Sequence, residues 1–371
     1  MKKVLTYLLV AALFATAFLS CMESLERESQ LSLKGDTVIL GGDTIKTRLP
    51  GLFITNEGNF MYGNASLTYY IPSEKKAFNE VFVRSTGYKM GDVAQSMTIR
   101  DGLGYIVMNN SGVIYVMDVG TFEVVGEIKP FTSPRYIHFL SDTKAYVTQL
   151  WDDRIAVINP QTYKITGYIR AEMDPGREST EQMVQYGKYV FTNCWSYDNR
   201  ILVIDSEIDE IVDEIEVGIQ PTSLVMDKYN KIWTVTDGGY AGSPYGHEAP
   251  SLYRIDAETR KVEKEFTFEF GDWPSEVQLN GTGDTLYFIN KAIWRIPVTA
   301  DEFPLRPFLP YEGTLFYGLA IDPQTSEVYV ADAIDYVQRG VVYRYTAEGE
   351  LVDKFRVGII PGAFCFKQEN Y

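Results

Sequence analysis

The amino-acid sequence predicts an all-β fold, a seven-bladed β-propeller of four-stranded blades over residues 51–371. Two observations predict a ring of repeated sheets: short apolar runs alternate with turn residues, and one strand pattern returns seven times at spacings of 41 to 54 residues. Such spacings are typical of four-stranded propeller blades. A third observation, a lone strand at the end of the chain, predicts that the ring is closed.

The repeated unit is clearest at residues 201–239. Its apolar runs ILVI, IVDEIEV, TSLVM and KIWTVT are each long enough for one strand, and turn residues separate them at 205–206, 218–221 and 227–230. Four antiparallel strands of this kind would form one small sheet with two apolar faces. A sheet of this size cannot bury both faces alone, so it needs copies of itself on either side.

The most regular part of each copy is the second strand of the predicted blade, which in 201–239 is the run KIWTVT. An aromatic or bulky residue stands inside a β-branched run in every copy, which favours a buried strand. The seven copies are LFITN at 52–56, YIVMN at 105–109, YVTQL at 146–150, YVFTN at 189–193, IWTVT at 232–236, LYFIN at 286–290 and VYVAD at 328–332.

Two turn positions repeat as well. An Asp or Asn closes the third strand, where an Asx-turn would start the hairpin to the outer strand. A proline stands just before the inner strand, a tolerated place for proline in a sheet. These positions are Asp118, Asn159, Asp205 and Asp256 for the turn, and Pro134, Pro221, Pro274 and Pro361 for the link between blades.

The two ends of the repeat region predict how the ring closes. The first repeat, from 51 to about 84, has three strands and lacks an inner one. Residues 362–367 form a single strand with the character of an inner strand. We therefore expect the last strand to complete the first blade, which removes an open sheet edge.

The first residues have the pattern of a secretory signal peptide over 1–20. Two lysines precede an apolar run at 4–19, and Ser20 stands directly before Cys21. This end resembles the lipobox of bacterial lipoproteins, although Phe18 stands where leucine is usual. The resemblance implies that Cys21 is lipidated and becomes the first mature residue. An ordinary signal peptide with an incidental cysteine is the alternative.

Residues 21–50 are mostly polar and are interpreted as a lipid-anchored tether. One short apolar run at 37–40 predicts a strand that lies against the body. The acidic stretch at 22–28 resembles the display signal of Bacteroides-type lipoproteins. That resemblance implies an outer-membrane protein whose body faces the cell exterior.

The charge balance limits the possible partners. The chain has 34 basic and 50 acidic residues, and removal of the signal leaves 32 basic residues and a net charge of −18. Such an acidic protein is a poor partner for nucleic acid or for an anionic lipid surface. Cys194 and Cys365 fall in different repeats at different strand positions, which favours two buried free thiols over a disulfide.

The loops that lead from second to third strands, and those between blades, meet on one face of a propeller. Three of the five tryptophans fall in these loops. Their side chains either plug the channel mouth or form a concave aromatic floor for a bulky ligand with polar edges. The candidate ligand-binding residues are Tyr62, Arg135, Trp151, Asp152, Gln182, Trp195, Tyr197, Tyr245, His247, Trp273, Tyr317 and Tyr336.

Neither a catalytic residue nor a metal ligand set is predicted. His138 lies inside a strand and is expected to pack there, whereas His247 is in the longest loop, either exposed or bound to an acid or a metal. Asp152 and Asp153 would suit calcium, although charged loop tips are usually just solvated. No serine nucleophile has a base at a recognisable spacing. The sequence therefore favours binding over catalysis.

The repeated pattern in VIDSEIDEIVDEIEVGIQPTSLVMDKYNKIWTVTD resembles the YncE-like propellers, over residues 51–367. With the lipoprotein start, the chain looks most like the BtuG group of Bacteroides surface lipoproteins. The resemblance implies capture of cobalamin (vitamin B12) and related corrinoids, and their transfer to an outer-membrane TonB-dependent transporter. It implies no covalently bound cofactor. Two alternatives stay open: a lactonase-like propeller enzyme, and a scaffold or glycan-binding lipoprotein of another uptake complex.

Overall fold

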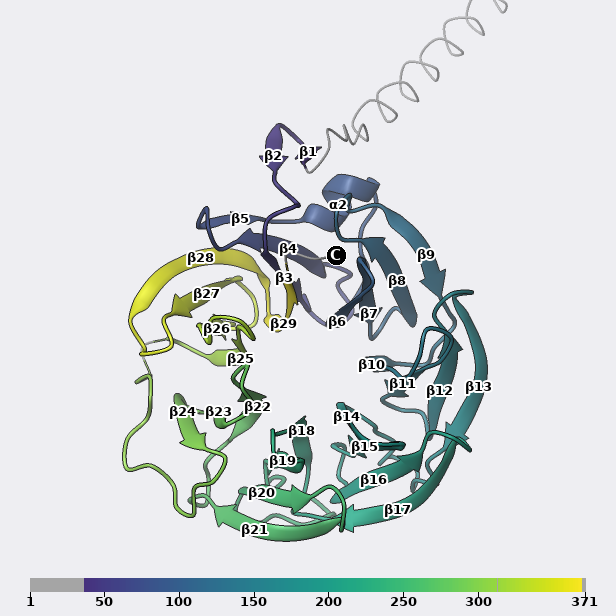
Figure 1. The fold of residues 1–371 in the computed structure, drawn as a ribbon, viewed down its shortest axis with the longest axis vertical. Helices are drawn as coiled ribbons and strands as arrows, with labels where there is room; N and C mark the ends of the chain where they lie inside the picture. Colours follow the sequence, from purple (N-terminus) through teal and green to yellow (C-terminus); the bar gives the residue numbers. More distant parts are fainter. Residues whose placement is uncertain (1–36, 312, 369–371) are drawn as a thin grey trace, which may run out of the picture.

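Seven small antiparallel sheets stand around a central axis in the computed structural model, which describes residues 37–311 and 313–368 (Figure 1). Each sheet is one blade, and we number the blades along the chain from the one that holds residue 51. The predicted seven-bladed propeller is confirmed.

The inner strands line the axis. In blade order they are β29 (Pro361–Lys367), β6 (Ala94–Arg100), β10 (Pro134–Phe139), β14 (Met183–Tyr186), β18 (Pro221–Met226), β22 (Ser275–Leu279) and β25 (Phe316–Ile321).

The second strands are buried along almost their whole length, and the seven aromatic-marked runs all fall on them, as expected. They are β3 (Gly51–Asn56), β7 (Leu103–Met108), β11 (Ala145–Gln149), β15 (Tyr189–Asn193), β19 (Lys231–Thr236), β23 (Thr285–Asn290) and β26 (Val328–Asp332).

The third and outer strands complete the blades. The third strands are β4 (Ser66–Ile71), β8 (Val113–Asp118), β12 (Arg154–Asn159), β16 (Arg200–Asp205), β20 (Ser251–Asp256), β24 (Ala292–Pro297) and β27 (Arg339–Tyr345). The outer strands are β5 (Lys76–Phe78), β9 (Val124–Ile128), β13 (Lys164–Arg170), β17 (Glu210–Glu216), β21 (Lys261–Thr267) and β28 (Leu351–Ile359).

Blade 6 departs from the four-stranded pattern, because the described residues give it three strands. A single bridge between Ile293 and Leu309 stands where the outer strand would pair. The connecting segment contains Pro304, Pro307 and Pro310. Proline has no backbone N–H to donate, so this segment cannot form a continuous ladder.

Residues 201–239 supply the four expected strands but not one sheet. β16 and β17 end blade 4, whereas β18 and β19 begin blade 5. The break falls at 218–221, where Gln220 has a left-handed φ of 59° and Pro221 starts the next inner strand. This segment therefore contains the link between two blades, and the expectation of a single sheet was wrong.

The predicted turns are present. Asp118 Oδ1 accepts hydrogen bonds from the backbone N–H groups of Gly120 and Thr121, both at 2.8 Å. The other three predicted residues make the same kind of contact with backbone N–H groups downstream: Asn159, Asp205 and Asp256.

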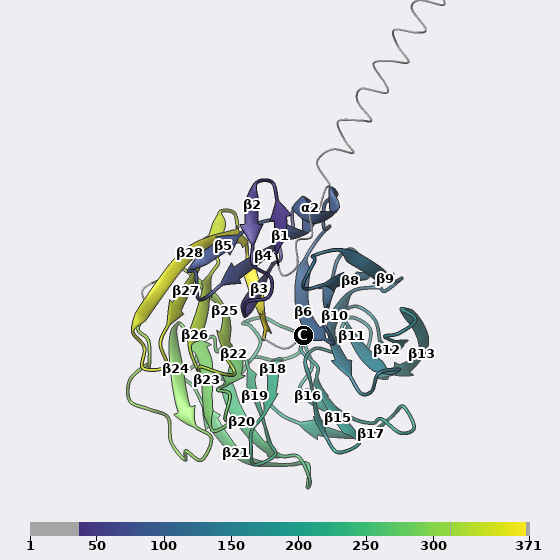
Figure 2. The same ribbon diagram turned by 45° about the horizontal axis from the view of Figure 1, so that its top comes forward.

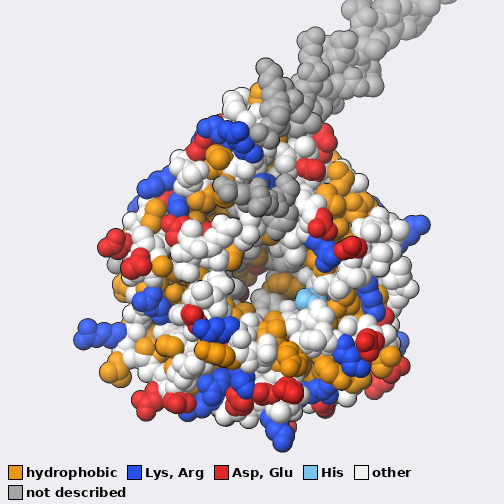
Figure 3. Space-filling model, in the orientation of Figure 1, with side chains coloured by type: hydrophobic (Ala, Val, Ile, Leu, Met, Phe, Trp, Pro, Cys, Tyr) orange, Lys and Arg blue, Asp and Glu red, His pale blue; other side chains and the backbone are white. Residues whose placement is uncertain are grey.

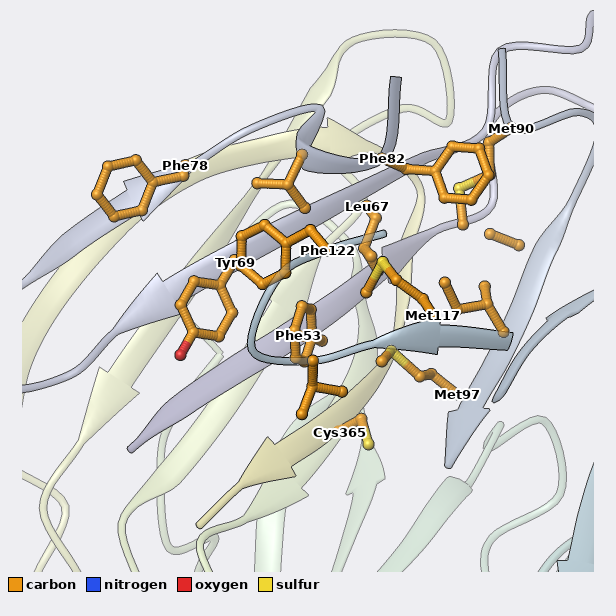
Figure 4. Close-up of a cluster of buried hydrophobic side chains, with 14 of the residues drawn as sticks. Phe53, Leu67, Tyr69, Phe78, Phe82, Met90, Met97, Met117, Phe122 and Cys365 are labelled. Carbon is orange, nitrogen blue, oxygen red and sulfur yellow. The ribbon is translucent and has the colours of Figure 1, made fainter. Parts of the chain in front are cut away.

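Each pair of neighbouring blades buries a hydrophobic cluster between their facing sheets. Side chains alternate along a strand, so β3 serves two clusters. Phe53 packs toward blade 2 against Tyr69 and Phe122, with ring centroids 4.7 and 5.7 Å away (Figure 4). Leu52 and Ile54 pack toward blade 7. The sheet does need neighbours on both sides, as expected.

The ring closes as predicted. β29 pairs antiparallel with β3, with Phe364 opposite Ile54, and so completes blade 1. Figures 1 and 2 show the yellow end of the chain beside its purple beginning. The two ends thus hold one sheet together.

The strand expected at 37–40 is β1 (Val38–Leu40), which pairs with β2 (Asp43–Ile45). Their apolar side chains join the core between blades 1 and 2, beside the short helix α2 (Val81–Thr86). The predicted signal peptide, the lipidation of Cys21 and the first part of the tether lie outside the described residues. Within the described ranges, no helix is long and apolar enough to span a bilayer.

Two smaller predictions are confirmed. Cys194 and Cys365 are buried and free rather than paired. His138 packs within β10, where its Nε2 lies 3.0 Å from Gln185 Oε1 and burial lowers its pKa.

Candidate functional site

A central cavity of about 860 Å³ lies between the inner strands. The space-filling view shows the molecule hollowed at its centre (Figure 3). Second strands end, and inner strands begin, on the same face, as the pairing of Pro134 with Gln149 shows. The cavity therefore opens among the loops that carry the sequence-predicted aromatic residues.

A register shift at the start of the inner strands shapes the cavity wall. In six blades one extra residue is inserted there, for example Gln95 between the pairs Ala94–Met108 and Ser96–Val107. In blade 4, Glu181 N–H donates to Asn193 O before the regular ladder begins, which leaves Gln182 at the same place. A bulge re-aims its extra side chain. We call these seven residues, all of which line the cavity, the collar: Gln95, Arg135, Gln182, Thr222, Glu276, Tyr317 and Gly362.

Gly362 has no side chain to fill its position in the collar, and the side chain of Glu57 takes that place. A Cβ on Gly362 would lie 2.6 Å from Glu57 Oε1, so any side chain there would displace the Glu57 carboxyl group. Glu57 follows the end of β3 and lines the cavity in its place. Its two carboxylate oxygens accept hydrogen bonds from Tyr317 Oη at 3.1 and 3.2 Å.

Arg135 is held by a buried ion pair. Its Nε lies 2.7 Å from Glu181 Oε2 and 3.0 Å from Oε1, and its Nη1 donates to Gln95 Oε1. The side chains of Arg135 and Glu181 are 17% and 3% exposed. Burial opposes the charge on Arg135, but Glu181, Tyr136 and Glu57 together outweigh burial and raise the pKa of the guanidinium.

Three carboxyl groups of the cavity, those of Glu57, Asp237 and Glu276, have no basic partner in an ion pair among the described residues, and burial raises the pKa of each. Two of these shifts are large. Burial raises the pKa of Glu57 to about 7, against the stabilising effect of Arg135. Burial, together with the charge of Glu57, raises the pKa of Glu276 to about 8. Both groups thus change protonation state near neutral pH, which ordinary surface carboxylates do not.

Aromatic side chains surround the mouth. Trp195, Trp273, Tyr311 and Tyr336 line the cavity with Tyr317. Trp195 Nε1 donates to Asp237 Oδ2 at 3.3 Å, and the rings of Tyr317 and Tyr336 meet edge to face at 5.7 Å. The mouth is apolar, and the collar below it is polar.

The structure separates the candidate residues into two sets of six. Arg135, Gln182, Trp195, Trp273, Tyr317 and Tyr336 line the cavity together. The other six lie outside its lining: Tyr62, Trp151, Asp152, Tyr197, Tyr245 and His247.

Most of the outer six lie in the loops around the mouth. Tyr62 and Trp151 are exposed, and His247 is exposed with its ring 4.6 Å from that of Phe270. Tyr197 and Tyr245 contact each other at 5.0 Å between ring centroids.

Asp152 is buried rather than solvated. Its carboxylate oxygens lie 2.8 Å from Nε and Nη2 of Arg154, and Thr132 Oγ1 donates to it. These partners account for its charge without calcium. Among the described residues, no cluster of three or more His, Cys, Asp or Glu side chains could hold a metal ion.

Several cavity residues were missed from the sequence. They are Glu57, Gln95, Tyr136, Glu181 and Glu276. A signal for part of this set existed: a collar residue directly follows the linking proline in blades 1, 3 and 5, and lies two residues after Pro274 in blade 6.

Comparison with known proteins identifies the family. A family model described as a domain of unknown function, DUF5074, matches residues 50–366. The chain belongs to this family. The DUF5074 region begins at β3 and ends within β29, so it spans the whole closed ring. No curated protein matches the sequence.

Solved structures with this DUF5074 fold include other propellers. A quinonprotein alcohol dehydrogenase-like protein from Bacteroides thetaiotaomicron is 13% identical, with a TM-score of 0.64 over 89% of this chain and 83% of that one. A protein described as a putative 6-phosphogluconolactonase from Bacteroides uniformis is 14% identical, with a TM-score of 0.65 over 86% of this chain and 99% of that one. The periplasmic gluconolactonase PpgL of Pseudomonas aeruginosa is 12% identical, with a TM-score of 0.62 over 85% of this chain and 98% of that one. Likeness at these identities shows the fold alone.

Proposed function

We propose that this DUF5074 protein captures cobalamin or a related corrinoid at the mouth of its cavity and passes it to an outer-membrane TonB-dependent transporter. The observation that carries the proposal is the cavity itself. Its 860 Å³ are near the upper end of ligand sites, which span about 300 to 1,000 Å³. Its mouth is aromatic and its wall is polar, so it suits a large ligand with both characters.

The chemistry of a corrinoid matches this arrangement. The corrin ring is broad and flat, and amide side chains project from its edge. Trp195 and Trp273 offer aromatic faces for the ring, and the collar offers hydrogen-bonding groups for the amides. A rigid, closed propeller holds these groups in place before binding, which limits the entropy cost.

Delivery to a transporter rests on the lipoprotein-like start of the chain. A lipid at Cys21 would hold the protein at the outer membrane, facing the cell exterior. Residues 21–36 would then connect the lipid to the hairpin β1–β2 at the edge of blade 1.

Co-elution tests the proposal. Purified mature protein is mixed with excess cyanocobalamin and separated by gel filtration, with absorbance read at the corrin bands. We expect the coloured ligand to elute with the protein at about one per chain. A protein peak without corrin absorbance, confirmed by flat calorimetry at micromolar ligand, contradicts the proposal.

A second candidate function is lactone hydrolysis in the same cavity. Glu57 and Glu276, with pKa values of about 7 and 8, are able to accept or donate protons near neutral pH. Two of the similar propellers are described as gluconolactonases. Hydrolysis of gluconolactone above the uncatalysed rate supports this candidate if Glu276→Gln abolishes it and Glu269→Gln, on the exposed rim, does not. Equal rates of hydrolysis with and without the protein exclude this candidate.

A further inference from the structure

The collar and the groups beside it set the charge of what can enter the cavity. The ionisable side chains that line it come from every blade around the axis except blade 2. They are Glu57, Arg135, Tyr136, Glu181, Asp237, Glu276, Lys291, Tyr311, Tyr317 and Tyr336. Four are carboxyl groups and two are basic, so the wall is acidic on balance.

Neither basic group is free to receive an anion deep in the cavity. Arg135 is already bound to both oxygens of Glu181 and to Gln95. Turning it toward another anion would leave Glu181, which is 3% exposed, as an unpaired buried charge. The side chain of Lys291 is 72% exposed at the rim, 3.5 Å from Asp272.

The remaining carboxyl groups make the wall unfavourable for an anion. Glu57 replaces the missing side chain of Gly362 and is held in place by Tyr317. Glu276 stands on β22, the inner strand next to β25, which carries Tyr317, and the charge of Glu57 acts on it. Where both groups are ionised, a carboxylate that enters between them meets like charge in a partly dehydrated space, and repulsion there is stronger than in water. A neutral group meets none of this repulsion.

We propose that the collar admits an uncharged, hydrogen-bonding group of the ligand, a carboxamide above all, and excludes a carboxylate or phosphate from the same position. An amide has both an acceptor oxygen and donor N–H groups. The carboxyl oxygens of Glu57 and Glu276 and the amides of Gln95 and Gln182 provide both kinds of partner. The inference rests on the proposed function for its ligand, because it selects corrinoids with intact side-chain amides.

A thiol placed in the collar tests the inference without any corrinoid. Thr222→Cys puts a reactive group in the collar, and Thr143→Cys puts one on an exposed hairpin as a reference. All variants carry Cys21→Ser, and the other two cysteines are buried. Each protein is treated with iodoacetamide and with iodoacetate, which differ only in carrying an amide or a carboxylate. Alkylation rates are read by mass spectrometry at pH 9, above the pKa values of about 7 and 8 of Glu57 and Glu276, so that both groups are ionised.

The ratio of the two rates is the result. We expect the ratio of the iodoacetamide rate to the iodoacetate rate to be about tenfold higher at the collar thiol than at the exposed thiol. A difference of this size is the effect of one nearby charge in a partly dehydrated site. Adding Glu276→Gln should reduce the difference between the rate ratios at the two thiols. Glu269→Gln removes an exposed charge from an interblade loop of the same face and should leave this difference unchanged. Equal ratios at the two thiols overturn the inference.

A corrinoid experiment separates this inference from the proposed function. Saturating cyanocobalamin should protect the collar thiol from iodoacetamide, and derivatives with one side-chain amide hydrolysed to a carboxylate should include one that binds at least about tenfold more weakly. Charge discrimination at the thiol without cyanocobalamin binding keeps the collar inference and rejects the proposed function. Equal binding of cyanocobalamin and of every carboxylate derivative keeps the proposed function and rejects the collar inference.

Discussion

At the scale of single residues, the cavity depends on where a few side chains are held. Trp195, Trp273 and Arg135 could be placed at the site from the sequence, because the repeat fixes which loops meet on one face. Glu57 and Glu276 could not be placed in this way. Their positions depend on an inserted residue in an inner strand and on the space left by Gly362, which no spacing between motifs reveals.

Glu276 predicts a pH dependence of stability. Its pKa is raised from 4.5 to about 8, so between these values the folded protein binds more protons than the unfolded chain. Its contribution to stability is therefore complete below about pH 4.5 and is lost as the pH rises through 8. Because one pKa unit corresponds to about 1.4 kcal/mol, Glu276→Gln should increase the free energy of unfolding by up to about 4 kcal/mol at pH 8 and by less than about 1 kcal/mol near pH 5.

Urea unfolding of both proteins at the two pH values measures this effect. Glu269→Gln removes an exposed carboxylate from the same face and serves as the control. A gain for Glu276→Gln that is the same at both pH values would show that the carboxyl group does not titrate as described.

At the scale of elements, the second strands were the most predictable part of the fold. Both faces of each are buried, so their aromatic and β-branched residues leave a strong pattern. The missing outer strand of blade 6 was harder to foresee, since an outer strand buries little and leaves a weak pattern. The split of 201–239 between two blades shows a further limit: a turn that ends a sheet has the same residue types as a turn within one.

Asparagines at the ends of second strands join neighbouring blades. Asn193 Nδ2 donates to Pro221 O at 2.7 Å, and Asn109 Nδ2 donates to Pro134 O at 3.2 Å. Asn193 is fully buried. We expect Asn193→Ala to lower the free energy of unfolding by about 1–3 kcal/mol, because a buried carbonyl loses its partner.

Denaturant titration checks this value against Asn199→Ala. Asn199 Nδ2 makes an exposed hydrogen bond to Glu216 at 3.3 Å, so its removal should change stability by less than about 0.5 kcal/mol. An equal loss of unfolding free energy in the two variants would show that the hydrogen bond between the blades stabilises the fold no more than an exposed one does.

At the scale of the whole molecule, closure of the ring was predictable because the repeat count was unbalanced at both ends. The chain begins its repeats without an inner strand and ends with one. What the cavity contains was less predictable, since it collects residues from all seven blades.

Removing the closing strand tests the role of closure. A chain that ends at Ile360 lacks β29 and exposes the edge of β3 and the core that Cys365 and Phe364 help to cover. We expect this chain to aggregate or to lose cooperative thermal unfolding, because an open, apolar edge invites pairing with other chains. A chain that ends at Lys367 keeps the strand and should behave as wild type in gel filtration and circular dichroism. Cooperative, monomeric unfolding of the shorter chain would contradict the role given to closure.

The central claim is that an aromatic mouth over a polar collar binds a corrinoid. Calorimetric titration with cyanocobalamin of the wild type, Trp195→Ala and Trp151→Ala tests it most directly, because Trp195 lines the cavity and Trp151, 56% exposed, does not. We predict that Trp195→Ala weakens binding at least about tenfold, the loss of one aromatic contact of about 1–2 kcal/mol, with thermal unfolding little changed, and that Trp151→Ala binds as wild type. Equal affinities in all three proteins, or no heat of binding in any, would contradict the claim.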